Sequence, residues 1–253
     1  MPRTLVFFHA HPDDEALLTS GTMARAAAEG QRVVLITATS GEAGLAAHEL
    51  QERGLAEIRE EELVRSARML GVQRLELLHY ADSGIHGDRV PTDGTTTLCQ
   101  APVDEVATAV AKILDQEQAD VLVTYDAAGG YGHPDHVRVH ECGIEAAHAA
   151  GTPNVFAVTA PREPFAIGVQ LADRLLPLPD EFDVEQFETA FTPGRDITHR
   201  VNVRRYLDFK RAALGAHASQ ASGADVRTLS ALLKLPRPVF SLLLGTEFYQ
   251  RLS

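Results

Sequence analysis

Apolar runs and helical patterns alternate along most of the chain, which is typical of a protein built from strands and helices in turn. Apolar runs predict five buried strands, at residues 4–10, 32–38, 75–80, 120–125 and 154–159. Between them, apolar residues at helical spacing predict helices that begin near Asp13 and over 54–70, 103–114 and 134–150. We therefore expect an α/β fold, Rossmann-like, with a mostly parallel sheet and helices on both faces.

The last third of the chain departs from this alternation. Residues 161–196 carry prolines at 161, 164, 177, 179 and 193, and we interpret this segment as a lid or substrate-shaping insertion within a C-terminal flap region. Residues 197–203 predict an edge strand and 204–217 a helix, followed by a tail with an apolar segment at 239–244. A length of 253 residues is compatible with one domain, so we expect residues 1–253 to form a single α/β domain.

The first predicted strand runs directly into His11-Pro12-Asp13-Asp14-Glu15. Pro12 ends the strand because it has no N–H to donate, and the two aspartates stand where a helix N-cap and first turn are expected. Ordinary helix capping is therefore one interpretation of this acidic turn. The other is functional, because the carboxyl edge of an open α/β sheet is where ligands bind.

A second cluster, Tyr131-Gly132-His133-Pro134-Asp135-His136, repeats the same chemistry after the fourth predicted strand. Two His-Pro-Asp turns at two strand ends are hard to explain by capping. Imidazole and carboxylate are ligands that suit zinc, so we predict a metal site formed by His11, Asp14 and His136. Three protein ligands leave a position for a water molecule, whose pKa a zinc ion lowers to about 7.

The remaining polar side chains of the two turns predict a hydrolytic site. Asp13 is well placed to act as general base, and His133 to stabilise an oxyanion or protonate a leaving amine. We expect Asp135 to orient His133, and Tyr131 to offer its hydroxyl to the same oxyanion. This set fits hydrolysis of an amide or ester carbonyl. The other histidines lack convergent partners in sequence and are interpreted as structural or surface residues: His9, His48, His79, His86, His140, His148, His199 and His217.

Two further stretches have weaker signals. Glu42 lies in a glycine-containing loop after the second strand, where it either reaches a polar ligand or belongs to a plain surface loop. Arg59-Glu60-Glu61-Glu62 form the polar face of a predicted helix, which is usually a solvated face.

Composition excludes several classes of partner. The chain has 23 Lys and Arg residues against 35 Asp and Glu, a formal net charge of −12, which gives no support for binding nucleic acid or an anionic membrane. Two cysteines without a CxxC motif form neither a zinc site nor a disulfide framework. No signal peptide or membrane-spanning run is apparent, so we expect a cytoplasmic protein with a small-molecule substrate. Homo-oligomer formation stays open.

At these motifs the sequence resembles the PIG-L/LmbE-like zinc-dependent N-acetylglucosaminyl deacetylases. The match consists of residues 10–15 and 130–137, and residues 206–214 with His217 resemble the mycothiol deacetylase and amidase branch. The resemblance implies a zinc site of His11, Asp14 and His136, and catalytic roles for the other residues of the two turns as given above. It further implies that Arg59 and Asp82 contact sugar hydroxyls.

The expected function is removal of an acetyl or other acyl group from an N-acylated amino sugar by metal-activated water. The alternative is an amidase acting on mycothiol-type S-conjugates. A dinucleotide-binding oxidoreductase is disfavoured because carboxylates replace the GxGxxG turn, and a serine hydrolase because no GxSxG elbow follows a strand. A non-catalytic metal- or sugar-binding module would not need the spare base and acid. Zinc is the expected metal, with ferrous iron as the alternative, because affinity favours zinc and availability decides.

Overall fold

The computed structural model describes residues 2–44, 54–92, 94–167, 189–221 and 227–253. Their elements are, in chain order: β1 (Thr4–His9), the π-helical turn η1 (Glu15–Thr19), α1 (Ser20–Ala28), β2 (Arg32–Thr39), α3 (Leu55–Met69), β3 (Arg74–Tyr80), α4 (Val103–Gln116), β4 (Val121–Tyr125), α5 (Pro134–Ala150), β5 (Val155–Thr159), β6 (His199–Asn202), the 3₁₀ turn η2 (Arg204–Tyr206), α8 (Leu207–Ala216), α9 (Ala218–Ala221), α10 (Arg227–Lys234), α11 (Arg237–Leu244) and β7 (Thr246–Arg251). The five predicted strands and the four helices between them are confirmed, with ends shifted by a residue or two.

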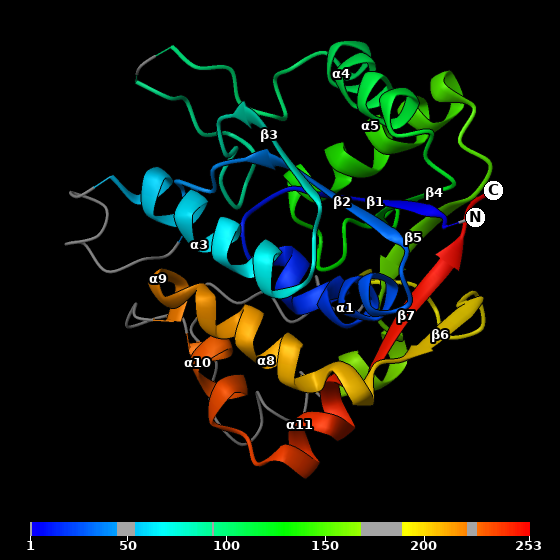
Figure 1. Ribbon diagram of the computed structural model, residues 1–253. Coiled ribbons are helices and arrows are strands. Elements are labelled where there is room, and N and C mark those ends of the chain that lie inside the picture. The colour runs from blue at the N-terminus through cyan, green and yellow to red at the C-terminus, as the bar shows by residue number, and fades with distance from the viewer. Residues whose placement is uncertain (1, 45–53, 93, 168–188, 222–226) are drawn as a thin grey trace.

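A seven-stranded sheet forms the centre of the molecule, with strand order β3-β2-β1-β4-β5-β7-β6. Strands β1 to β5 are parallel, while β7 runs antiparallel to both of its neighbours. Figure 1 shows α4 and α5 together on one side of the sheet, and α1, α3 and α8 packed together on the other. The predicted Rossmann-like sheet, covered by helices on both faces, is confirmed.

The neighbouring strands β1 and β2 lie inside the sheet, and they are apolar because both of their faces are covered. Phe7 and Phe8 of β1 and Leu35 and Ile36 of β2 are fully buried, as are the residues of α4 that repeat at helical spacing. An uninterrupted apolar run is what such a strand requires, which is why these segments could be recognised in the sequence.

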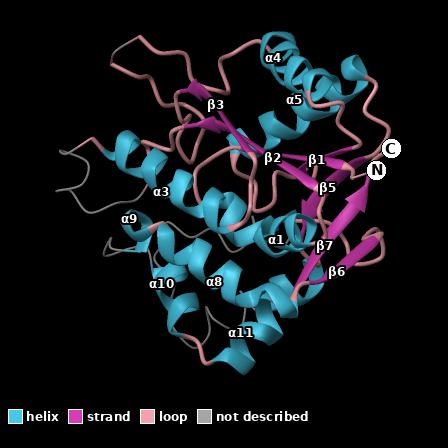
Figure 2. Cartoon of the chain, in the orientation of Figure 1, coloured by secondary structure: helices cyan, strands magenta, loops and turns pink. Residues whose placement is uncertain are grey.

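Strand β7 was not predicted. The sequence indicated only an apolar tail, whereas residues 237–244 form α11 and residues 246–251 return as a strand between β5 and β6. β6 is the edge strand, as predicted. Figure 2 shows the long loop between β3 and α4, which contains no regular helix or strand among its described residues. Most of the predicted lid at 161–196 lies outside the described residues.

Candidate active site

Two loops form the candidate site, the turn after β1 and the loop after β4. β1 and β4 are neighbouring parallel strands, so their carboxyl ends lie side by side. The chain places β2 and β3 on one side of β1 before it crosses to β4 on the other. In open α/β sheets such a switch point is where ligands bind. Both His-Pro-Asp motifs therefore meet at the ligand-binding edge of the sheet.

Three donor atoms from these loops converge on one point. His11 Nδ1 lies 3.3 Å from His136 Nε2 and 3.4 Å from Asp14 Oδ2, and His136 Nε2 lies 3.4 Å from the same oxygen. Ligand atoms 2.0–2.1 Å from a tetrahedral zinc are about 3.3 Å apart. The three residues therefore have the spacing and the donor types of a zinc site.

The electrostatics of this point also favour a cation. Burial alone would lower the pKa of His11, but the carboxylates of Asp82, Asp135 and Asp14 outweigh it and raise the pKa well above the usual range. Surroundings that attract a proton to His11 this strongly attract a metal cation for the same reason. The donor set and its charge thus fit the metal that the sequence predicts.

Two other groups of donors share His11 with this set. The nitrogens of His11, His133 and His136 lie within 4.8 Å of one another, as do donor atoms of His11, Asp82 and Asp135. The second of these uses His11 Nε2, which is 3.1 Å from Asp135 and 3.8 Å from Asp82. We favour His11, Asp14 and His136, because their pairwise distances are equal and short.

Buried partners hold these ligand candidates in place. Tyr125 donates its hydroxyl to Asp14 at 2.7 Å, and its ring stacks on His136 with the ring centroids 4.2 Å apart. The hydroxyl of Tyr125 also accepts the backbone N–H of Ala10 and lies 3.1 Å from His9 Nδ1. Such outer contacts fix the orientation of metal ligands. His9 therefore has buried partners, although none was predicted for it. The role of Tyr125 was not predicted either, and its only signal in the sequence is its position at the end of β4.

The glycine-rich loop after β4 supplies another of these contacts. Gly129 has φ +65°, and an added Cβ would lie 2.8 Å from the backbone nitrogen of Val137. Its carbonyl oxygen lies 3.2 Å from His136 Nδ1, which leaves Nε2 for a metal. Only glycine allows this backbone path so close to α5.

Asp135 contacts His133 through its backbone, while its carboxylate has other partners than the predicted His133. The carboxylate of Asp135 lies 3.1 Å from His11 Nε2 and accepts the backbone N–H of Ser83. His133 contacts only the backbone of this residue, because its Nδ1 accepts the N–H of Asp135 at 3.2 Å. Burial would raise the pKa of Asp135, but the contacts with His11 and Ser83 hold it below its usual range. Asp135 therefore orients a ligand candidate.

Asp13 is the carboxylate left over at this point, and it does not cap a helix. It has φ 111°, a conformation that non-glycine residues rarely adopt, and Asp14 at the N-cap of η1 makes no capping bond with its side chain. Arg59 lies 3.3 Å from Asp13 Oδ2. Burial raises the pKa of Asp13 to about 6, although Arg59 opposes the shift. A carboxylate with a pKa close to neutrality is suited to general base catalysis.

The backbone of Asp13 is held by a buried network that the sequence did not reveal. Asp13 donates its N–H to Glu15 Oε2 at 2.9 Å, and Glu15 accepts the hydroxyl of Ser66. The other partner of Glu15 is His217, at 2.7 Å from Glu15 Oε1. His217 is fully buried, so its interpretation as a residue without convergent partners is wrong. Since His217 follows α8, the C-terminal part of the chain supports the first motif.

His133 and Tyr131 are in ring contact with the histidines among the ligand candidates. Burial and the neighbouring His11 and His136 lower the pKa of His133 to about 3, so it is neutral. Its Nδ1 accepts a hydrogen bond, which places the ring proton on Nε2. The ring of Tyr131 meets that of His136 edge to face, with centroids 5.2 Å apart. Both side chains offer hydrogen-bond donors next to the candidate metal point.

A cavity of about 290 Å³ opens onto these groups. It is lined by His11, Asp13, Asp14, Ala43, Gly44, Arg59, Asp82, Gly84, Ile85, Tyr131, His133 and Gln220. Arg59 and Asp82, which the resemblance assigned to sugar binding, are both among them. Arg59 also donates to the carbonyl oxygens of Pro12 and Gly41, so it anchors the turn after β1 and the loop after β2. Gln220 was not singled out in the sequence.

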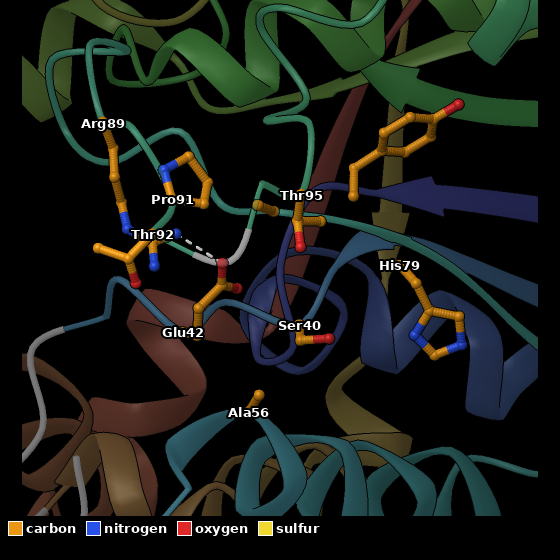
Figure 3. A pocket seen from close by; sticks show the side chains of 10 residues that line it. Ser40, Glu42, Ala56, His79, Arg89, Pro91, Thr92 and Thr95 are labelled. Carbon is orange, nitrogen blue, oxygen red and sulfur yellow. Dashed lines mark hydrogen bonds and ion pairs between the residues drawn. The ribbon is translucent and has the colours of Figure 1, made fainter. Parts of the chain in front are cut away.

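Glu42 lies in a neighbouring hollow. Figure 3 shows it facing Arg89, which donates to Glu42 Oε1 at 2.6 Å, in a pocket of about 250 Å³. The same oxygen accepts the backbone N–H of Asp82 at 3.1 Å. Glu42 therefore holds the end of β3 in place, and it is not among the residues that line the cavity containing the ligand candidates.

The predicted polar face of α3 is only partly solvated, since Glu61 is exposed and Glu60 half-buried while its other two members are buried. Arg59 and Glu62 are 3% and 2% exposed. Glu62 accepts the backbone N–H and the hydroxyl of Ser219, which follows α8. This face is covered because α8 and α9 pack against α3.

Among the other histidines interpreted as structural, His48 lies outside the described residues.

The switch point of this α/β fold thus carries buried histidines and carboxylates that could hold a metal ion, where a dinucleotide-binding protein has a glycine-rich turn. The chain belongs to the PIG-L family: the model of that family, described as GlcNAc-PI de-N-acetylase, matches residues 6–147. The resemblance seen in the sequence is thereby confirmed.

Relatives and solved structures agree with this assignment. The chain is 38% identical to a 1D-myo-inositol 2-acetamido-2-deoxy-α-D-glucopyranoside deacetylase of Thermobifida fusca, over 89% of this chain and 86% of that protein. It shares its fold with N,N'-diacetylchitobiose deacetylase from Pyrococcus horikoshii, with TM-score 0.64, 21% identity and coverage of 99% and 84%. A 4-carboxy-2-hydroxymuconate hydratase from Pseudomonas putida has the same fold, with TM-score 0.62, 16% identity and coverage of 99% and 96%. The fold alone therefore does not decide the reaction.

No helix within the described residues is long and apolar enough to cross a membrane.

Proposed function

We propose that this protein is a metal-dependent deacetylase that hydrolyses the acetamido group of an N-acetylglucosamine-type sugar. The observation that carries the proposal is the convergence of His11, Asp14 and His136 beside an uncoordinated carboxylate, that of Asp13. The relatives named as deacetylases of an acetamido sugar linked to inositol support the substrate class, and support it over the S-conjugate amidase. A binding module would need no such spare carboxylate.

His11, Asp14 and His136 would hold the metal, which is zinc by donor type, with ferrous iron as the alternative. When bound, the ion supplies a Lewis acid that polarises the amide carbonyl and acidifies water. Tyr125 keeps the Asp14 carboxylate in place, and Asp135 keeps the imidazole of His11 in place. These outer contacts mean that the site needs little reorganisation to accept the ion.

Asp13 acts as the general base of the reaction. Its carboxylate takes a proton from the attacking water, whose oxygen forms a bond to the amide carbon. Breaking the C–N bond then needs a proton on the nitrogen, and Asp13 is the group that has just received one. Acetate and the free amine leave. With a pKa of about 6, most of Asp13 is ionised at neutral pH, and the neighbouring Arg59 favours this state by opposing the effect of burial.

His133 serves this reaction as a hydrogen-bond donor. A neutral imidazole with its proton on Nε2 can donate to the developing oxyanion, and the hydroxyl of Tyr131 is a second donor. Of the two roles predicted for His133, stabilisation of the oxyanion is therefore the one that its resting protonation supports.

The experiment is acetate release from 1D-myo-inositol 2-acetamido-2-deoxy-α-D-glucopyranoside by zinc-loaded protein and by Asp13→Asn. We expect the variant to keep its metal content and to lose roughly 10²–10⁴-fold in kcat, the range of a lost general base. Asp88→Asn, at an exposed position, is the matched control and should behave as the parent protein. No acetate from metal-loaded parent protein, or an Asp13→Asn variant as active as the parent, would contradict the proposal.

A further inference from the structure

After α8 the chain turns at His217 into the short helix α9, and this turn, residues 217–220, brings a distant part of the chain to the candidate site. His217 reaches Glu15, and Ser219 reaches Glu62 with both its N–H, at 2.8 Å, and its hydroxyl, at 2.6 Å. All four residues are buried. This turn is therefore fixed on both sides, and it lies outside residues 6–147, which the family model matches.

Gln220 is the residue that this turn delivers to the cavity. It lines the cavity together with Asp13 and Arg59, although only 5% of its surface is exposed. An ideal Cβ built on Gly44 would clash with the guanidinium of Arg59 and lie 3.0 Å from Gln220 Oε1. The polar ends of Arg59 and Gln220 thus both lie beside Gly44, in space that a larger side chain at this position would occupy.

The carboxamide of Gln220 is not required to fix the turn. Within the described residues, its hydrogen bonding consists of one long contact, from Nε2 to Ser219 Oγ at 3.4 Å. The anchoring is done by the buried pairs of His217 and Ser219. A nearly buried amide beside a polar cavity, with weak partners of its own, has hydrogen-bonding capacity left for a ligand.

We propose that Gln220 is a substrate-contacting residue whose carboxamide hydrogen-bonds a hydroxyl of the amino sugar, next to Arg59. This inference rests on the proposed function. An amide offers one acceptor and two donors, and so it matches a hydroxyl group, which is both donor and acceptor. A site built to hydrogen-bond a hydroxyl discriminates strongly against analogues that lack it. Gln220 then helps to select a hydroxyl-rich sugar over an acylated amine without hydroxyls.

The test compares Gln220→Met with the parent protein in steady-state acetate release from the inositol-linked acetamido sugar. Methionine keeps the length of the side chain and removes its hydrogen-bonding groups. We expect KM to rise about tenfold and kcat to change less than about threefold, as for a lost binding contact. Metal content and melting temperature should stay at the parent values. Gln100→Ala, at an exposed position, is the control and should leave both constants unchanged.

Two further measurements separate the possible failures. Gln220→Asn keeps the amide but withdraws it by one methylene, and should also raise KM, which keeps the inference testable if Gln220→Met does not fold. An active parent protein with unchanged kcat/KM in Gln220→Met would overturn the role of Gln220 and leave the deacetylase proposal standing. A loss confined to kcat and accompanied by a lower melting temperature would show a structural role instead. No acetate from the parent protein would overturn both proposals.

Discussion

Replacing Tyr125 by phenylalanine removes the hydroxyl group that is hydrogen-bonded to the ligand candidate Asp14. The hydroxyl donates to Asp14 at 2.7 Å and accepts the N–H of Ala10 at 3.1 Å, while His9 Nδ1 lies at the same distance. The ring, which stacks on His136, is kept. The substitution therefore isolates the hydrogen bonds from the packing.

The expected cost can be worked out from these contacts. A hydrogen bond to a charged group contributes about 1.5–3 kcal/mol, and a buried N–H left without an acceptor costs about 1 kcal/mol or more. Tyr125→Phe should therefore lower the free energy of unfolding by about 3 kcal/mol. At roughly 2–4 °C per kcal/mol for a chain of this size, the melting temperature should fall by about 6–12 °C. Loss of a contact that orients a ligand should weaken metal binding by about 10–100-fold.

The assay is a zinc titration against a competing chelator, at a temperature where both proteins are folded, with thermal unfolding measured in parallel. Tyr80→Phe is the matched control, because it deletes the same atom from an exposed hydrogen bond to Glu105 of 3.0 Å. The free energy of unfolding of that control should fall by less than about 1 kcal/mol, and its affinity for zinc should not change. A Tyr125→Phe protein with the zinc affinity of the parent would refute the idea that this hydroxyl orients Asp14.

Three further predictions concern stability, each measured by denaturant or thermal unfolding. Two arginines lower the pKa of Glu117 to about 2 through hydrogen bonds, so its contribution is complete above about pH 4.5 and is lost as the pH falls toward 2. Glu117→Gln should lower the free energy of unfolding by about 1 kcal/mol at pH 7, a modest loss because its partner Arg32 is exposed. The variant should also lose less stability than the parent as the pH falls from 4.5 toward 2. An equally steep loss of stability in the variant would contradict this role of Glu117. Gly143→Ala should cost about 1–3 kcal/mol, because the new Cβ would lie 2.8 Å from Thr124 Oγ1, and unchanged stability would mean that α5 can move away from β4. Glu247→Gln should lower the free energy of unfolding by about 3 kcal/mol or more, because it removes the carboxylate 2.7 Å from Lys210, whose side chain is 1% exposed. A smaller loss would show that water solvates the Lys210 ammonium group in the variant.

The sequence predicted the inner parallel strands because strands covered on both faces are mostly apolar along their length. Val121–Tyr125 and Val155–Thr159 satisfy this condition. It failed for Thr246–Arg251, which alternates between buried and half-buried residues and contains two charged ones. That strand is stabilised by Glu247, whose carboxylate accepts the N–H groups of Gly21 and Thr22 at the start of α1. No local pattern announces a contact between residues so far apart.

The two motifs predicted the members of the site, but not how they pair. Parallel strands end at the same edge of a sheet, so histidines and aspartates after two such strands could be expected to meet there. That β1 and β4 are immediate neighbours follows from the strand order, which periodicity does not encode. The partner of Asp135 was wrong for the same kind of reason. Its proximity to His133 in sequence was visible, while the neighbouring position of His11 in space was not.

The three consecutive carboxylates of the first motif show why such distant partners are needed. Like charges on adjacent residues with little exposure to water repel one another, so each of these carboxylates needs a compensating partner. Asp13 faces Arg59 from α3, Asp14 is bonded by Tyr125 from β4, and Glu15 is paired with His217 after α8. Carboxylates at successive positions can point to three different partners only if the backbone turns sharply between them. This explains the φ of 111° at Asp13 and the π-helical turn that begins at Glu15. The sharp turn leaves Asp13 lining the cavity, and the partners that hold the three carboxylates apart come from distant positions in the chain: Arg59, Tyr125 and His217.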